Sequence, residues 1–231
     1  MLVLAIDTAS PGGGLAILED SRILGVVSTQ VEETYSSRLF RHLEFLLTET
    51  RLELRSMDLF AVSAGPGSFS GLRIGLTAVK GWAEVLAKPI ATVSGLEAVA
   101  AQARSGLGLL APVLDARRGQ IYAALYRRGA QGLERQGDER VMSADEFLES
   151  LPEPSAGAAH TFVTPIPELL AEPLARSAFR GCAIERVSTV LAPVIGQLGM
   201  ERALRGEIVD SLHLDANYIR RCDAESSWKD R

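Results

Sequence analysis

The feature that most constrains this chain is a glycine-punctuated turn, AGPGSFSGLRIG (64–75), which joins an apolar strand to a helix. The run LFAVSAG (59–65) reads as a buried strand, and a helical pattern extends from Ser68 to Ala87, where Pro89 prevents its continuation. Glycine permits backbone conformations that are closed to other residues, so the chain can turn sharply here. A strand that turns directly into a helix favours a layered α/β fold.

Free N–H groups at the start of this helix could receive an anion, but the turn matches no established phosphate motif. A P-loop requires a lysine and a hydroxyl residue after its last glycine, whereas Leu72 and Arg73 follow Gly71. The dinucleotide fingerprint needs a third glycine where Ser70 stands. A nucleophile elbow needs a central serine where Phe69 stands. A tight turn made for packing is at least as well supported as a phosphate site.

The first hundred residues alternate between strand and helix patterns. Three short strands joined by tight turns predict an antiparallel meander, and strands and helices then alternate. We predict strands at 2–7, 15–20, 23–30, 59–65 and 89–95, and helices at 34–50, 68–87 and 96–104. This order predicts an α/β fold with a mixed sheet.

The pattern restarts after Gly108, and we expect a second, smaller lobe from residue 106 to 231, with the first lobe at 1–105. Two strands are predicted around a tight Arg-Arg-Gly turn within 112–128. Helices are predicted at 143–150, with a serine N-cap, and at 189–204, with Pro193 in its first turn. Residues 151–180 contain five prolines and read as loop-rich. We expect the last helix and the tail to pack back toward the first lobe.

Composition limits the classes of function. The formal net charge is −5, which argues against a nucleic-acid binder that acts through its overall field, although a local basic patch stays open. Cys182 and Cys222 have no metal-type spacing, which is typical of a reducing compartment. The N-terminus lacks the parts of a signal peptide, and no apolar run reaches the roughly 18 residues of a membrane span. We therefore expect a cytoplasmic protein without membrane contact.

The two early helices predict a partner-binding surface. On the first, five residues form a core-facing stripe and Phe45 falls on the opposite side. The second is apolar on nearly all sides apart from one narrow polar strip, so it is buried on more than one side. A central helix within its own lobe explains this pattern about as well as an intermolecular interface. The stripe comprises Leu39, Phe40, Leu43, Leu46 and Leu47; the polar strip comprises Arg73, Thr77, Lys80 and Glu84. The candidate interface residues are Leu39, Phe45, Arg73, Ile74, Ala78 and Trp82.

Candidates for catalysis are few. No two of the three histidines, His42, His160 and His213, are close enough to form a helical metal pair. Asp7 ends the first strand and could hold a metal-bound water near a nucleotide, or could cap the following turn. Asp115 ends another strand and carries the same ambiguity. The candidate nucleotide contacts are Asp7, Thr8, Gly65, Gly67 and Ser68.

Nearly the whole chain resembles the TsaB (YeaZ) family. The resemblance rests on the AIDT opening, AGPGSFSGLRIGLTAVKG, PIATVSGLEA, LDARRGQIY, YIRR and a late WK. It implies the actin-like, RNase H-like fold in two lobes. It also implies a role in making threonylcarbamoyladenosine beside the anticodon of tRNA, as the partner of a TsaD-type transferase, with a TsaE-type ATPase completing the set. The family pairs through its two early helices, so a homodimer is expected for the chain alone, and tRNA is reached through the complex.

The resemblance also implies that this chain is not the enzyme. The metal-binding histidine pair of TsaD falls at Gly95 and Val99, and neither can ligate a metal. No cofactor is then required, and only weak ATP or ADP binding is expected. One departure is that Tyr35 and Ser36 stand where many members have His-Ser. The alternative is a nucleotide-binding ATPase or phosphotransferase of the actin-like superfamily, for which Asp7 and the glycine turns are the motivation.

Overall fold

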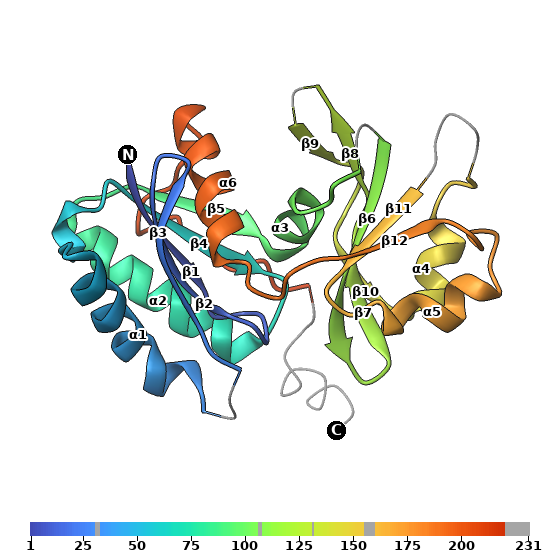
Figure 1. The fold of residues 1–231 in the computed structure, drawn as a ribbon, viewed down its shortest axis with the longest axis horizontal. Helices are drawn as coiled ribbons and strands as arrows, with labels where there is room; N and C mark the ends of the chain where they lie inside the picture. Colours follow the sequence, from blue (N-terminus) through green and yellow to red (C-terminus); the bar gives the residue numbers. More distant parts are fainter. Residues whose placement is uncertain (31–32, 106–107, 131, 155–159, 220–231) are drawn as a thin grey trace. The chain divides into compact units, whose positions relative to one another are not determined.

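A computed structural model describes residues 1–30, 33–105, 108–130, 132–154 and 160–219. The chain divides into two compact units, one formed by Met1–Ala98 with Thr189–Tyr218 and the other containing Val99–Ser188 (Figure 1). This division differs from the expected lobes at 1–105 and 106–231. The boundary passes through helix α3 (Gly95–Ala101), and helix α6 (Ala192–Leu204) belongs to the first unit because it packs on β1, β2, β4 and β5.

The first unit is built on a five-stranded sheet in the order β3-β2-β1-β4-β5. The expected meander is confirmed, since β1–β2 and β2–β3 are antiparallel, whereas β4 and β5 run parallel to β1. The strands are β1 (Leu2–Asp7), β2 (Gly14–Glu19), β3 (Arg22–Ser28), β4 (Leu59–Gly65) and β5 (Ile90–Ser94), and the helices α1 (Tyr35–Thr50) and α2 (Phe69–Leu86) follow the predicted order, with a short 3-10 turn at Leu54–Ser56.

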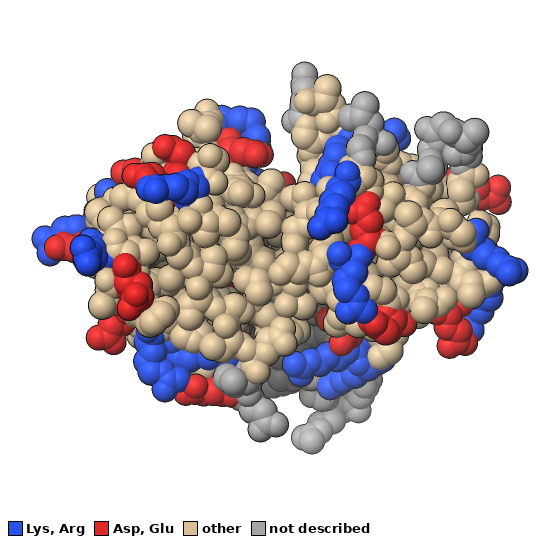
Figure 2. Space-filling model, viewed as in Figure 1, with Lys and Arg blue, Asp and Glu red and all other residues tan. Residues whose placement is uncertain are grey.

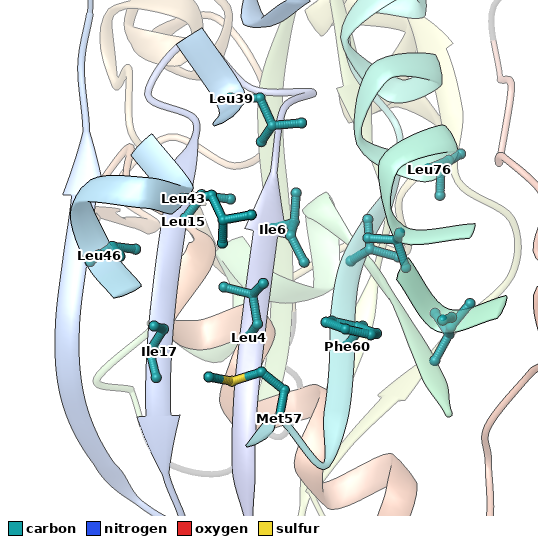
Figure 3. Close-up of a cluster of buried hydrophobic side chains, with 14 of the residues drawn as sticks. Leu4, Ile6, Leu15, Ile17, Leu39, Leu43, Leu46, Met57, Phe60 and Leu76 are labelled. Atoms are coloured by element: carbon teal, nitrogen blue, oxygen red, sulfur yellow. The ribbon is translucent and has the colours of Figure 1, made fainter. Parts of the chain in front are cut away.

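Helices cover both faces of this sheet, which is why β1 reads as an uninterrupted apolar run. Alternate residues of β1 point to opposite faces. Leu4 and Ile6 join the core beneath α1 and α2, which also contains Phe60 (Figure 3). Ala5 faces α6, where a Cβ added at Gly196 would lie 3.2 Å from the Ala5 methyl. Small residues on both sides therefore let α6 lie close against the strands.

The second unit is built on a sheet with the order β10-β7-β6-β11-β12, from which β8 and β9 branch at β6. The parallel strands β6, β11 and β12 lie side by side, and β7 and β8 pair antiparallel with β6. The strands are β6 (Gly108–Arg117), β7 (Gln120–Ala123), β8 (Tyr126–Gly129), β9 (Gly132–Arg135), β10 (Arg140–Met142), β11 (His160–Thr164) and β12 (Ala183–Arg186), with helices α4 (Ala144–Ser150) and α5 (Glu168–Ala175).

The structure confirms the serine cap of α4, because Ser143 and Glu146 form a complete capping box. The loop-rich prediction for 151–180 is wrong over its described part, which contains β11 and α5. Pro173 lies inside α5, and the helix persists because Leu170 and Leu174 are buried in the core of the unit. Part of the predicted tail, 220–231, lies outside the described residues. Among the described residues, no helix has both the length and the apolar character needed to cross a bilayer.

Candidate functional site

The glycine turn between β4 and α2 is pressed against the end of β1. Ser68 caps α2 by accepting the Gly71 N–H at 3.2 Å, and its own N–H donates to the Ala9 carbonyl at 2.9 Å. A Cβ at Gly67 would lie 2.6 Å from that carbonyl oxygen, and one at Gly71 would collide with the Thr8 carbonyl. Glycine is therefore required here for close approach of two backbone segments.

Asp7 and Thr8, the other candidate nucleotide contacts, are used to hold this junction together. The buried Asp7 carboxylate accepts the N–H groups of Ala9 at 2.9 Å and Ser10 at 3.2 Å, and also the Ser10 hydroxyl. Burial raises the pKa of Asp7, while these hydrogen bonds act in the opposite direction. Thr8 donates from Oγ1 to the Gly71 carbonyl at 2.7 Å. The arrangement explains both residues as parts of the β1 turn, and Gly65 lies at the end of β4 with φ 114°.

The first turn of α1 packs on the same region. Tyr35 is buried, and a Cβ at Gly13 would collide with its hydroxyl group. Burial, together with the nearby charge of Asp7, raises the pKa of Tyr35 to about 12. The Arg38 guanidinium lies 4.0 Å from the Tyr35 ring centre and donates to the carbonyl and the hydroxyl of Thr29, both at 2.9 Å. Tyr35 is thus a packing residue that stays protonated at neutral pH.

The apolar residues of α1 divide differently from the predicted stripe. Leu39 is only 1% exposed and belongs to the core of the unit, so its assignment to the partner interface is wrong. Phe40, predicted to face the core, is 62% exposed, because the core side of α1 is already filled by Leu39, Leu43 and Leu46. Phe45 is 54% exposed. Residues five apart leave a helix about 140° apart, so Phe40 and Phe45 lie on opposite flanks of α1.

Phe40 contacts α2. Its ring stands edge-on to Trp82 with 6.3 Å between the centroids, and Trp82 in turn contacts the buried Phe60 at 6.0 Å. We call the resulting surface the α1–α2 face. It comprises Phe40, Ile74, Ala78, Trp82 and Val85. Val85 is 82% exposed and is not among the predicted interface residues.

Two exposed residues of the polar strip of α2, Arg73 and Glu84, also contact the segment Glu207–Tyr218. Arg73 Nε donates to the Tyr218 hydroxyl at 3.3 Å, and its guanidinium lies 4.0 Å from the centre of the Phe69 ring. At the other end of the helix, Glu84 accepts the Ser211 hydroxyl. Arg73, a predicted interface residue, is therefore engaged within its own unit.

Backbone pairing and one core residue fix this segment. Val209 forms an antiparallel bridge with Ile90, Asn217 donates to the Ala64 carbonyl at 2.8 Å, and Leu214 is 2% exposed. The tail was expected to pack back toward the first lobe, and residues up to Tyr218 do belong to the first unit. The contacts themselves were not predicted, because a twelve-residue segment without regular periodicity carries no local signal of what it covers.

The positions that correspond to metal-binding histidines lie in α3. Gly95 is the first residue of the helix, and Val99 is fully buried. Within the residues that the structure describes, no group of three histidine, cysteine or acidic side chains is arranged to hold a metal ion.

Comparison with known proteins agrees with this architecture. The family model for TsaD, tRNA N6-adenosine threonylcarbamoyltransferase, matches residues 16–193. The tRNA threonylcarbamoyladenosine biosynthesis protein TsaB of Bacillus subtilis is 32% identical over 99% of this chain and 98% of its own length. YeaZ from Pseudomonas aeruginosa superposes with a TM-score of 0.77 and 25% identity over 94% of this chain and 99% of its own.

A more distant structure shows the fold alone. Component A of the Acidaminococcus fermentans (R)-2-hydroxyglutaryl-CoA dehydratase superposes with a TM-score of 0.51 at 10% identity, covering 88% of this chain and 99% of its own. The expected actin-like fold of two units with mixed sheets is thereby confirmed. Full-length similarity at 32% identity, together with the family match, means that the chain belongs to the TsaB (YeaZ) family of tRNA threonylcarbamoyladenosine biosynthesis proteins.

Proposed function

We propose that this chain is a non-catalytic subunit that binds and activates a TsaD-type transferase through the α1–α2 face. The observation that carries the proposal is the exposure of Phe40, which contacts Trp82, and of Val85, which follows Trp82 in α2. Large apolar side chains gathered on one surface mark interaction sites more often than isolated ones do. Aromatic residues in particular are enriched where protein partners bind.

The shared ancestry of the two proteins supports the choice of partner. The TsaD family model covers residues 16–193, a range that includes both α1 and α2. A transferase with the same fold carries corresponding helices, so two such surfaces can meet as a four-helix contact. The same surface on a second copy of this chain would form an isologous homodimer. In this scheme a TsaE-type ATPase joins the pair, tRNA is bound by the assembly, and the complex acts in the cytoplasm.

The local chemistry supports the non-catalytic role. Asp7 is fully buried with three hydrogen-bond donors of its own turn, and Thr8 and Ser68 bond to the neighbouring segment. Phosphate transfer requires carboxylates that remain available to a metal and a nucleotide. We therefore propose that no cofactor is required and that any ATP or ADP binding is weak. Turnover of ATP by the purified chain that Asp7→Asn abolishes would contradict this assignment.

The pairing is tested by size-exclusion chromatography of the chain with its cognate TsaD-type transferase at micromolar concentration. A single co-eluting heterodimer is expected, and two separate species would refute the proposal. Ala78→Arg places a charge in the centre of the face and should abolish co-elution. Ala203→Arg makes the same change on α6, which packs on the sheet apart from that face, and should leave the heterodimer intact.

A further inference from the structure

The hairpin formed by β6 and β7 extends beyond its own sheet. β6 pairs with β8 only as far as Leu110 and with β11 as far as Pro112, whereas its pairing with β7 continues to Arg117. On the other side, β10 reaches β7 only at Ile121. We call residues Ala116–Gln120 the ribbon tip, since the ladders of β8, β10 and β11 with this hairpin all lie outside this range. The tip lies at the carboxyl edge of the parallel strands (Figure 1).

The ribbon tip has an unusual backbone for the residues that it carries. Three consecutive residues have positive φ, namely Arg117 at 62°, Arg118 at 55° and Gly119 at 74°. The Asp115 carboxylate accepts the Arg117 N–H at 2.6 Å and so helps to hold the turn. A residue with a Cβ is strained in this conformation, and hairpin turns of this kind favour Asn and Gly instead. Two arginines in such strained positions point to a role for their side chains.

Charge and exposure agree with an interaction role. Arg117 and Arg118 are both exposed, and within the described residues the Arg117 side chain makes no ion pair. Elsewhere, positive and negative side chains alternate on the face shown in Figure 2, in keeping with the net charge of −5. Contact with a polyanion must therefore come from a local group of cations. Arginine suits phosphate especially well, because its planar guanidinium can donate two parallel hydrogen bonds.

We propose that Arg117 and Arg118 at the ribbon tip bind backbone phosphates of the tRNA while the chain is in complex with the transferase. This inference rests on the proposed function, and tRNA is favoured as the ligand because the family modifies tRNA. Contacts to phosphates position the RNA without reading its sequence.

The test uses a variant that keeps the turn and removes both charges. Arg117→Asn/Arg118→Gly places residues that accept positive φ at both positions, so the hairpin should fold at least as well as in the native chain. Affinity of the transferase complex for an unmodified tRNA transcript is measured by fluorescence anisotropy over a series of KCl concentrations. We expect weaker binding, with the slope of log affinity against log salt less steep by about one to two.

Two controls separate charge from other effects. Arg117→Lys/Arg118→Lys keeps the charge and should keep most of the salt dependence. Arg127→Gln/Arg180→Gln removes two exposed arginines from other elements of the same unit and should leave the slope unchanged. An unaltered affinity and slope for the Asn-Gly variant would overturn the proposal. Loss of pairing with the transferase in that variant would overturn it too, since the tip would then be a protein contact.

The proposed function can fail independently. If the native chain does not pair with the transferase, the subunit role is refuted. If the native and Asn-Gly chains both pair with the transferase and bind tRNA with the same affinity and salt slope, the subunit role stands and the phosphate contact is refuted.

Discussion

Gly71 and Gly81 lie in the same helix, but their surroundings are opposite. A Cβ at Gly71 would collide with the Thr8 carbonyl, whereas a Cβ at Gly81 would meet no atom within 4 Å. The first glycine therefore serves packing between α2 and the end of β1. The second only weakens the helix, because glycine lacks the conformational restriction that favours alanine there.

This contrast predicts opposite effects for one substitution. Gly71→Ala should lower the free energy of unfolding by about 1–3 kcal/mol, since the backbone carbonyl cannot move without shifting β1. Gly81→Ala should raise it by up to about 1 kcal/mol. Urea denaturation of dilute samples measures both. Equal effects of the two changes would mean that α2 does not approach β1 as closely as described.

His160 makes the second unit sensitive to acid. It is 2% exposed on β11, its ring lies edge-on to Phe179, and burial lowers its pKa below the usual 6.5. The unfolded chain therefore takes up a proton more readily than the folded chain as pH falls through 6.5. Stability should be complete above that value and should decline below it.

Replacing His160 with leucine should remove this part of the pH dependence while leaving stability near neutral pH similar or higher. Thermal unfolding recorded between pH 5 and 8 would show a flatter profile for the variant. A native profile that stays constant between pH 6.5 and 5 would contradict the assignment.

At the scale of elements, helix α3 shows how a short helix is held at its carboxyl end. Arg128, on β8, donates to four carbonyl groups: those of Ala100, Ala101, Ala103 and Ser105, at 2.7–3.2 Å. The last carbonyls of a helix have no partner within the helix, and a cation there also complements the helix dipole. One side chain thus satisfies the last two carbonyls of α3 and two carbonyls of the segment that follows it.

Arg128→Met should destabilise the chain by about 2–4 kcal/mol, because several carbonyls lose a charged donor at once. The neighbouring Arg127 is exposed, so Arg127→Met should change stability by no more than about 0.5 kcal/mol. Amide hydrogen exchange at Gln102 and Ala103, whose N–H groups bond within this turn, reports the local effect. Unchanged protection of these amides from exchange in the Arg128 variant would show that water replaces the hydrogen bonds of the guanidinium.

For the whole molecule, the proposed surface can serve only one partner at a time. If homodimer and heterodimer both use the α1–α2 face, the two assemblies exclude each other. Stepwise addition of the transferase should convert the homodimer into heterodimer, with the amount set by the two affinities.

Sedimentation velocity should then show the homodimer boundary disappearing as the heterodimer boundary grows. No species containing two copies of this chain and one transferase should form through this face. Persistence of the homodimer in such a larger species would place its interface elsewhere.

Much of the architecture could be predicted from sequence, because periodicity and turn residues act locally. The meander, the order of strands and helices up to residue 101, the serine cap of α4 and the end of α6 follow from nearest neighbours along the chain. The resemblance, together with the full-length comparisons, identified the family. The structure then showed that the Asp7 carboxylate accepts the N–H groups of the following turn and that Val99 is fully buried.

The tertiary structure decided what each apolar or polar stripe faces. A hydrophobic pattern reports that a residue is suited to burial but not which element covers it, so the pattern placed Phe40 in the core-facing stripe although its side chain is exposed. The polar strip of α2 lies beside a segment more than a hundred residues away in the chain. Pro173 is tolerated inside α5 because Leu170 and Leu174 of the same helix are buried in the core of the second unit. The backbone strain at the two arginines of the ribbon tip likewise could be recognised only from their φ angles in the structure. The sequence alone established that a turn at the glycines leads into a helix. Only long-range packing decided that Gly67 and Gly71 are needed for close contact with the residues that follow β1.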